Sequence, residues 1–435
     1  MNNLQLIAKL KNTISNNRWI YKLALANFIL RILYIFIFST PDNYIITDMG
    51  AYNERALNLI RGNARPFTNY WAPFFHIFLA VIYWPLEKLN MLEYKIRLVV
   101  VILAILGSIS VIFIYKITRK LFNEKAAKFS AIVYAIWYPI IYLNIFLLSE
   151  NLFIPLLYFG LYLFYNKQKL QHSDLLVGLV LGLATITRPA ILIFIILFGL
   201  WLLIKKRLKY LIGFSAMFLL VLACISIFNQ KTTLNTTKFI SSGNGMNFAM
   251  EWCDAKSIEY YDGYIRFGFA PPANSYYPED KRLFTSEPFH NESHYYKLGW
   301  NCIKENPSII YRNIRSIKNT FDSEIFPNFV NIFAWRELYT VFKIFNIGLF
   351  FATIIALFKT EKRKIWNDLA PLIFLIIAIF GSVYIFNPGE ERYLIPFTPI
   401  FIILNANWIT SINKKSITKY MNKYRKKLKS LNFKQ

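Results

Sequence analysis

The chain has 435 residues, of which 56% are hydrophobic and 17% are charged, and its mean hydropathy is +0.36. Soluble globular proteins are less apolar and carry about 25% charged residues, so this composition excludes a soluble enzyme and a disordered chain. Three cysteines are too few for a disulfide scaffold. The net charge of +26 raises the question of which side of a membrane the basic residues occupy.

Long apolar runs are the main pattern along the chain. A helix needs roughly 17–25 apolar residues to cross about 30 Å of hydrocarbon. Ten runs qualify, the fourth to sixth of them short: 19–39, 98–118, 126–148, 151–165, 175–187, 190–204, 210–228, 338–358, 366–386 and 393–412. We therefore predict an all-α polytopic membrane protein with about ten transmembrane helices.

Clusters of lysine and arginine predict how the helices are oriented across the membrane. With ten spans, the clusters all fall on one side; they lie within residues 9–22, 116–128, 167–169, 205–209, 359–364 and 414–434. The excess of basic residues in cytoplasmic loops places this side, and both ends of the sequence, in the cytoplasm. An apolar run over 70–89 would invert the later loops if it crossed, so we interpret it as a helix in the outer interface.

Four regions follow from this topology. Residues 1–228 form an N-terminal transmembrane module with spans 1–7, and its first outer loop covers 40–97. Residues 229–337 form a small mixed extracytoplasmic loop domain, 338–412 hold spans 8–10, and 413–435 are a basic cytoplasmic tail. Cys253 and Cys302 both fall in the loop domain, where they either form a disulfide or remain two thiols.

Charged residues gather at the predicted outer boundary of the membrane, because charges inside spans are costly. The acids there are Asp42, Asp48, Glu54, Glu87, Glu93, Glu150, Glu390 and Glu391, and the basic residues at the same level are Arg97, Arg188 and Arg392. Carboxylates can deprotonate a hydroxyl and arginines can hold a phosphate. The layout therefore predicts a site on the outer face.

Asp48 is the sharpest candidate in this layout. It follows the first span closely, in Thr-Asp-Met-Gly-Ala-Tyr, and precedes apolar residues at helical spacing (Ala56, Leu57 and Ile60). This places Asp48 near the N-terminus of a short interfacial helix. From the residues alone, a catalytic carboxylate and an N-cap aspartate are both open.

A set of short motifs, spread over nearly the whole chain, resembles the GT-C glycosyltransferases. The motifs are Asp48-Met-Gly-Ala-Tyr52, Trp71-Ala72-Pro73, Arg97-Leu98, Thr118-Arg119-Lys120-Leu121-Phe122, Ser149-Glu150, Gly182-Leu183-Ala184, Thr187-Arg188-Pro189, Asn306-Pro307 and Glu391-Arg392-Tyr393-Leu394. They are most similar to glycosyltransferase family 39, which holds the protein O-mannosyltransferases and the aminoarabinose transferases acting on lipid A. Where that family often has a proline pair, this sequence has Ala72-Pro73.

The resemblance implies a hexosyl- or pentosyltransferase that takes a sugar from a polyprenyl-phosphate carrier. The acceptor is a hydroxyl of a lipid, glycan or protein on the extracytoplasmic face of the cell (inner or plasma) membrane. By matching positions, Asp48 is the general base on the acceptor hydroxyl. Arg97, Arg188 and Arg392 bind the donor phosphate.

Further charged and polar residues have two readings each. Glu150, Glu391 and Tyr52 either contact the acceptor or take part in ion pairs around the arginines. Arg31, near the middle of the first span, points to the carrier phosphate or is paired within the bundle, because an unpaired charge there is costly.

No metal, other cofactor or nucleic acid is expected. Position 50 is Gly, so Asp48 forms no Asp-x-Asp pair, and His290 and His294 lack a third ligand in view. Two other functions remain as alternatives. One is a polysaccharide ligase or polymerase with a diphosphate-linked donor. The other is a lipid or sugar transporter, which is disfavoured because the two halves show no symmetry and only Arg31 is central.

Overall fold

The computed structural model describes residues 18–37, 39, 41–45, 47–62, 71–166, 172–232, 240–241, 244–253, 258–261, 264–267, 292–314, 317, 321, 335–386 and 391–411. The helices of the first half are α2 (Arg18–Ile37), α3 (Thr47–Arg61), α4 (Phe74–Lys88), α5 (Lys95–Leu121), α6 (Glu124–Ala135), α7 (Tyr138–Leu143), α8 (Glu150–Tyr165), α9 (Ser173–Thr187), α10 (Leu192–Ile204) and α11 (Leu208–Thr232). The later ones are α12 (Asn244–Trp252), α13 (Glu292–Glu305), α14 (Ile309–Arg312), α16 (Trp335–Phe358), α17 (Lys362–Lys364), α18 (Ala370–Phe386), α19 (Glu391–Leu394) and α20 (Thr398–Ser411). Strands β1 (Ile258–Tyr261) and β2 (Tyr264–Phe267) pair antiparallel, with Ile258 opposite Phe267.

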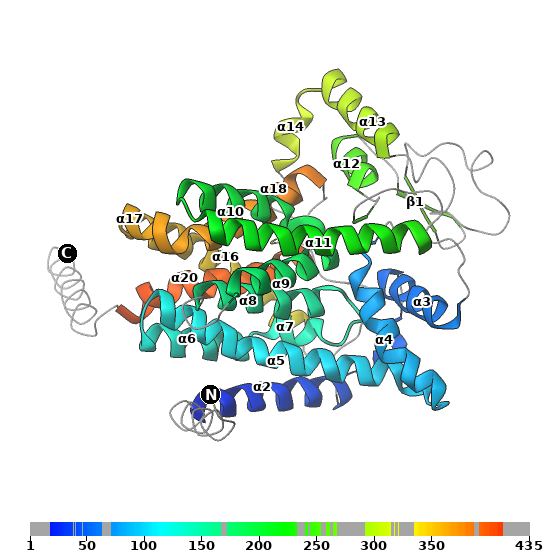
Figure 1. Cartoon of the computed structure of the whole chain (residues 1–435), viewed down its shortest axis with the longest axis horizontal. Helices are drawn as coiled ribbons and strands as arrows, with labels where there is room; N and C mark the ends of the chain where they lie inside the picture. The colour runs from blue at the N-terminus through cyan, green and yellow to red at the C-terminus, as the bar shows by residue number, and fades with distance from the viewer. Residues whose placement is uncertain are drawn as a thin grey trace, which may run out of the picture.

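The long helices lie side by side, roughly along the longest axis of the molecule (Figure 1). Six stretches are long and apolar enough to cross a membrane: Arg18–Ile37, Leu92–Leu121, Leu208–Thr232, Thr340–Phe358, Lys362–Phe386 and Arg392–Ser411. Two apolar helices are shorter, Ser173–Thr187 and Pro189–Ile204. The predicted class of helical polytopic membrane protein is confirmed, whereas the number of ten spans is not.

One predicted span, 126–148, is divided in the structure. Helix α6 ends at Ala135, and α7 begins after Trp137, whose backbone is extended, with Pro139 in its first turn. Proline suits that position because its missing N–H would have no partner there. Irregular backbone at membrane depth is tolerated where protein buries it, and residues 137–155 are almost all buried. The break leaves a short connection that leads to Ser149 and Glu150.

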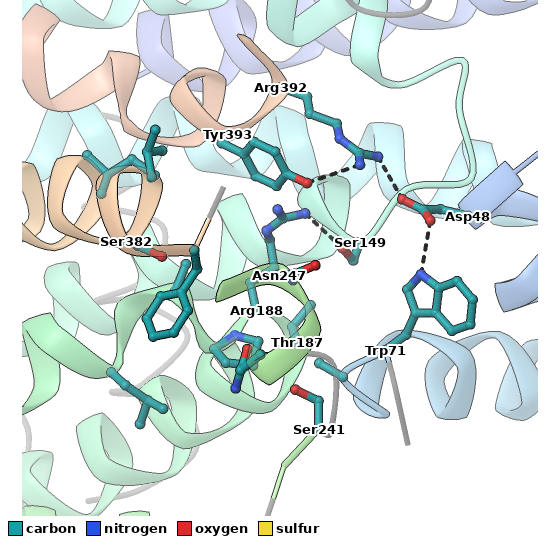
Figure 2. Close-up of a pocket in the computed structure, with 18 of the residues that line it drawn as sticks. Asp48, Trp71, Ser149, Thr187, Arg188, Ser241, Asn247, Ser382, Arg392 and Tyr393 are labelled. Carbon is teal, nitrogen blue, oxygen red and sulfur yellow. Dashed lines mark hydrogen bonds and ion pairs between the residues drawn. The ribbon is translucent and has the colours of Figure 1, made fainter. Parts of the chain in front are cut away.

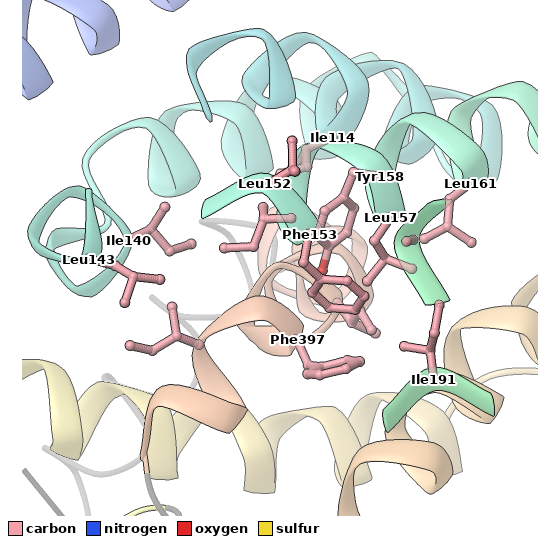
Figure 3. Close-up of a cluster of buried hydrophobic side chains, with 14 of the residues drawn as sticks. Ile114, Ile140, Leu143, Leu152, Phe153, Leu157, Tyr158, Leu161, Ile191 and Phe397 are labelled. Atoms are coloured by element: carbon pink, nitrogen blue, oxygen red, sulfur yellow. The ribbon is translucent and has the colours of Figure 1, made fainter. Parts of the chain in front are cut away.

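The main core joins the two transmembrane regions of the chain. Figure 3 shows side chains of α5, α7 and α8 packed around Phe397, which precedes α20. The Phe153 and Phe397 ring centroids are 6.0 Å apart, and the Tyr158 hydroxyl donates a 2.9 Å hydrogen bond to the Pro396 carbonyl. The segment that follows Arg392 is therefore fixed against α8.

Helices α3 and α4 gather at one end of the bundle, on the side where α12 and α13 also lie (Figure 1). The Tyr52 and Phe75 rings meet edge to face at 4.9 Å. In the loop domain, Cys253 and Cys302 form a disulfide with their Cα atoms 5.2 Å apart, which is the first of the two readings of these cysteines. The Trp252 indole N–H donates to the Ile385 carbonyl at 3.0 Å, so α12 is tied to the end of α18.

Basic turns gather at the opposite end of the bundle. The Lys364 ammonium lies 4.9 Å from the Phe122 ring centroid, and the Lys205 ammonium lies 5.5 Å from that of Trp366. These contacts bring together the turns that follow α5, α10 and α16, which are widely separated in sequence. Figure 1 places α6 and α17 at the end away from α3 and α4.

Arg31 lies inside the bundle, 1% exposed. Its Nε donates to Asn27 Oδ1 at 2.9 Å, and its Nη1 donates to the Ile140 carbonyl at 3.3 Å and to Asn144 Oδ1. In α5, a Cβ added at Gly107 would lie 2.7 Å from Arg31 Nη1. The guanidinium therefore occupies space that a larger side chain at position 107 would fill. Its hydrogen-bond acceptors are neutral.

We expect Gly107→Ala to destabilise the protein by about 1–3 kcal/mol, the usual cost of overpacking a tight core. The added methyl must displace the guanidinium from its acceptors. Thermal unfolding in detergent measures this effect, and Gly348→Ala is the matched control because a Cβ there meets no described atom within 4 Å. Equal unfolding temperatures for the two variants would contradict the tight contact.

Candidate active site

A pocket of about 420 Å³ opens where several helix ends meet. Its lining comes from α3, the start of α8, the end of α9, α12, α18 and α19 (Figure 2). This volume is within the usual range of small-molecule sites. Because the lining is drawn from residues 48 to 393, the pocket exists only when nearly the whole chain is folded.

Asp48 lies in the first turn of α3, and each carboxylate oxygen has a partner from elsewhere in the chain. The Trp71 indole N–H donates to Oδ1 at 3.0 Å, and Arg392 Nη1 donates to Oδ2 at 2.8 Å. Burial alone would raise the pKa of this carboxyl, but the Arg392 charge and the two hydrogen bonds outweigh it and hold the pKa below its ordinary value. Asp48 is therefore ionised at neutral pH.

Arg188 forms the second ion pair of the site. It directly follows α9 in an extended conformation, before Pro189. Its Nη1 lies 2.6 Å from Glu150 Oε1, with the side chains 16% and 1% exposed, and also donates to Ser149 Oγ at 3.3 Å. Burial lowers the pKa of Arg188, but Glu150, Tyr393 and Tyr52 together outweigh burial and the pKa is raised. The guanidinium keeps its charge.

Tyr393 lies beside both arginines. Its ring centroid is 4.9 Å from the Arg188 guanidinium and 5.1 Å from that of Arg392, and Arg392 Nη2 donates to its hydroxyl at 3.1 Å. Two guanidiniums are thus held near one another by two carboxylates and one aromatic ring. Guanidinium groups bind phosphate oxygens in pairs, so this arrangement can accept a phosphate.

The structure brings together Asp48, Tyr52, Arg188 and Arg392 of the predicted site, with Glu150 directly behind Arg188. Burial raises the pKa of the Tyr52 hydroxyl, so Tyr52 stays neutral and can only donate or accept hydrogen bonds.

Two other predicted site residues, Arg97 and Arg31, are not part of the pocket lining. Arg97 is 56% exposed and pairs with Asp42 at 2.9 Å. Glu391 begins α19, but its side chain is outside the described residues. Of the three arginines predicted to bind phosphate, Arg188 and Arg392 line the pocket.

Two histidines, His290 and His294, bear on the prediction of a reaction without metal. His290 lies outside the described residues, as does the side chain of His294. Over the parts of the chain that the structure describes, no group of three or more His, Cys, Asp or Glu side chains could hold a metal ion. A reaction without metal stays a prediction.

Several pocket residues were not singled out as site residues in the sequence. Trp71 and Tyr393 appear there only within motifs, whereas Ser382, Asn244 and Asn247 carry no motif of their own. Ser382 is a polar residue within an apolar span, and the two asparagines are spaced by about one helical turn. Each of these two patterns is visible in the sequence and could have marked these residues as candidates.

Comparison with known proteins finds a family match and similar solved structures. Residues 80–229 match the model of the family described as dolichyl-phosphate-mannose-protein mannosyltransferase. No curated protein matches the chain. The apo oligosaccharyltransferase of Archaeoglobus fulgidus is similar in structure, with a TM-score of 0.51 and 14% identity over 89% of this chain and 50% of that one.

An oligosaccharyltransferase of Archaeoglobus fulgidus in complex with an inhibitory peptide and a dolichol-phosphate is also similar, with a TM-score of 0.49 and 14% identity over 96% of this chain and 52% of that one. The chain therefore spans about half the length of these solved structures. The family match over residues 80–229 and the fold shared with the apo oligosaccharyltransferase confirm the predicted GT-C-like fold.

Proposed function

We propose that the chain transfers a sugar from a polyprenyl-phosphate-linked donor to an acceptor hydroxyl on the extracytoplasmic face of the cell membrane. The observation that carries this proposal is the meeting of Asp48 with Arg392, 344 residues apart, beside Arg188 in one pocket. A carboxylate next to two guanidiniums supplies a base for the acceptor and cations for a departing phosphate.

The chemical step follows from these groups. The acceptor oxygen attacks the anomeric carbon, and its proton passes to the Asp48 carboxylate. The bond between the anomeric carbon and the phosphate oxygen breaks, and the lipid phosphate leaves with the electron pair. Arg188 and Arg392 stabilise the negative charge that develops on that phosphate.

Binding of the donor also changes the base. Without the donor, Arg392 is paired with Asp48, and this pairing lowers the pKa of the carboxyl and its basicity. A phosphate that takes Arg392 as its partner competes with Asp48 for the guanidinium. The pKa of the Asp48 carboxyl then rises when the donor is in place. The carboxylate is therefore the stronger base at the time when the acceptor proton must be removed.

The distribution of charge supports an outer location for the pocket. Glu150 opens α8 at the pocket, and the other end of that helix reaches the basic end, where the Tyr165 hydroxyl donates to the Asp368 carbonyl at 2.9 Å. Helix α10 runs from the pocket residue Leu192 to the basic turn at Lys205. Because basic loops stay in the cytoplasm, the pocket belongs on the opposite face.

Labelling of single added cysteines tests this topology. Tyr311 in α14 is 78% exposed, and Lys362 begins α17 in a basic turn. A membrane-impermeant maleimide should label Tyr311→Cys in intact cells and label Lys362→Cys only after permeabilisation. Labelling of both positions in intact cells would contradict the orientation. The wild type, which carries the native thiol of Cys224, is the background control and should stay unlabelled.

The activity itself is tested with purified protein in vesicles that contain a radiolabelled polyprenyl-phosphate sugar. The expected result is transfer to an acceptor without added metal. Activity lost on addition of a chelator, or seen only with a diphosphate-linked donor, would favour the ligase or polymerase alternative. Movement of intact donor between leaflets without any product would favour a transporter.

A further inference from the structure

The pocket combines side chains of two kinds. One kind belongs to the ion pairs of Asp48 with Arg392 and of Arg188 with Glu150, which lies behind it. The other kind is uncharged hydroxyl and amide side chains from two distant segments; they are Ser241, Asn244, Asn247 and Ser382. Figure 2 shows Asp48 and Trp71 on one side of the pocket and Ser382 on the other, with Arg188 between them.

The two asparagines belong to α12, whose sequence gives it two faces. Asn244 and Asn247 are three residues apart and so lie on one face of the helix. Phe248 and Trp252 form another face, which packs on the end of α18: the Phe248 and Phe386 rings are 6.3 Å apart and Trp252 bonds to Ile385. The apolar face anchors the helix and leaves the amide face to the pocket.

The position of α12 is fixed by close contacts with α13. A Cβ added at Gly245 would lie 2.7 Å from the Glu292 carbonyl oxygen, so the two helices approach as closely as glycine allows. At the other end of α12, Cys253 is joined to Cys302 of α13. The amide groups are thus held on a rigid support, as selective hydrogen bonding requires.

Hydroxyl and amide groups are suited to a neutral ligand with many hydroxyls. Each can both donate and accept a hydrogen bond, whereas the phosphate has its own cations in Arg188 and Arg392. The sugar is covalently attached to that phosphate, so it must lie within the same pocket. We propose that Asn247 and Asn244 of α12 select the donor sugar by hydrogen bonding to its hydroxyl groups, an inference that rests on the proposed transferase function.

The test compares donors related by the configuration of one hydroxyl, as mannose and galactose each are to glucose, and a pentose donor that lacks the hydroxymethyl group. Polyprenyl phosphates carrying mannose, glucose, galactose or arabinose are given to the full chain in vesicles with one fixed acceptor. Asn247→Ala and Asn244→Ala should lower the ratio of kcat/KM between the preferred donor and its nearest epimer by about 3- to 30-fold, since each removes a neutral hydrogen bond to the substrate.

Asn301→Ala is the matched control, because Asn301 is an exposed asparagine of α13 outside the pocket lining. It should leave the donor ratios unchanged. Inhibition by polyprenyl phosphate without sugar should be equal in wild type and the α12 variants, because that ligand reaches only the arginines. Equal unfolding temperatures and an intact Cys253–Cys302 disulfide show that the variants are folded.

Two results would overturn the inference while leaving the transferase function intact. One is an unchanged donor ratio in both asparagine variants. The other is a changed KM for the acceptor with unchanged donor preference, which would assign α12 to the acceptor. If wild type transfers none of the sugars and binds polyprenyl phosphate no better with a sugar than without one, the proposed function fails, and the inference with it.

Discussion

Asp48→Asn is expected to lower the rate of sugar transfer by about 10²- to 10⁴-fold, the usual contribution of a general base. The asparagine keeps the size of the side chain, but its single carbonyl oxygen can accept from Trp71 or from Arg392 and not from both, whereas the two oxygens of Asp48 accept one hydrogen bond each. Asparagine cannot take up the acceptor proton. The loss should therefore appear in kcat, with normal insertion, measured as transfer from a radiolabelled polyprenyl-phosphate donor in vesicles.

Asp42→Asn is the control for this variant. Asp42 belongs to the same outer loop, but its partner is the exposed Arg97, away from the pocket. Its activity should stay close to that of wild type. Near-normal transfer by Asp48→Asn would assign Asp48 to a structural role at the start of α3, because asparagine is nearly as good as aspartate at a helix N-terminus.

Arg392→Gln is expected to reduce kcat/KM for the lipid-linked donor by about 10²- to 10³-fold, as for the loss of one donor to a developing oxyanion. Arg392→Lys should fall between this variant and wild type, because lysine keeps the charge but not the paired N–H groups. Arg61→Gln is the control, since Arg61 pairs with Glu87 at the surface and is 47% exposed. Equal kcat/KM values for the Arg392 and Arg61 variants would remove Arg392 from donor binding.

The pH dependence of the same variant gives an independent readout. In the wild type, burial favours the neutral acid, but Arg392, together with Trp71 and Arg188, outweighs burial and lowers the pKa of Asp48. A rate that requires the carboxylate is then lost only below the ordinary range of aspartate. Without Arg392 burial dominates and the pKa of Asp48 rises, so the acidic limb of the rate profile of free enzyme should move to higher pH. If the acidic limb of the profile stays at the same pH, Arg392 does not lower the pKa of the group on which the rate depends.

The class of the protein and the direction of its charges could be predicted from the sequence. Apolar runs and basic clusters are local properties, because hydrocarbon thickness sets the length of a span and each loop carries its own charge. Asp48, Arg188 and Arg392 could also be proposed from their places at span ends. The exact division into helices could not, since the break before Pro139 lies within a run that is apolar throughout.

What only the tertiary structure decided is which of these residues meet. Arg97 and Arg188 both lie at a helix end, yet Arg97 faces outward to Asp42 and Arg188 faces inward to Glu150. The same packing brings Arg392 to Asp48 and the amide face of α12 to the pocket. Hydropathy fixes that a helix crosses the membrane but not its rotation or its neighbours, because those depend on side-chain packing between helices far apart in the sequence.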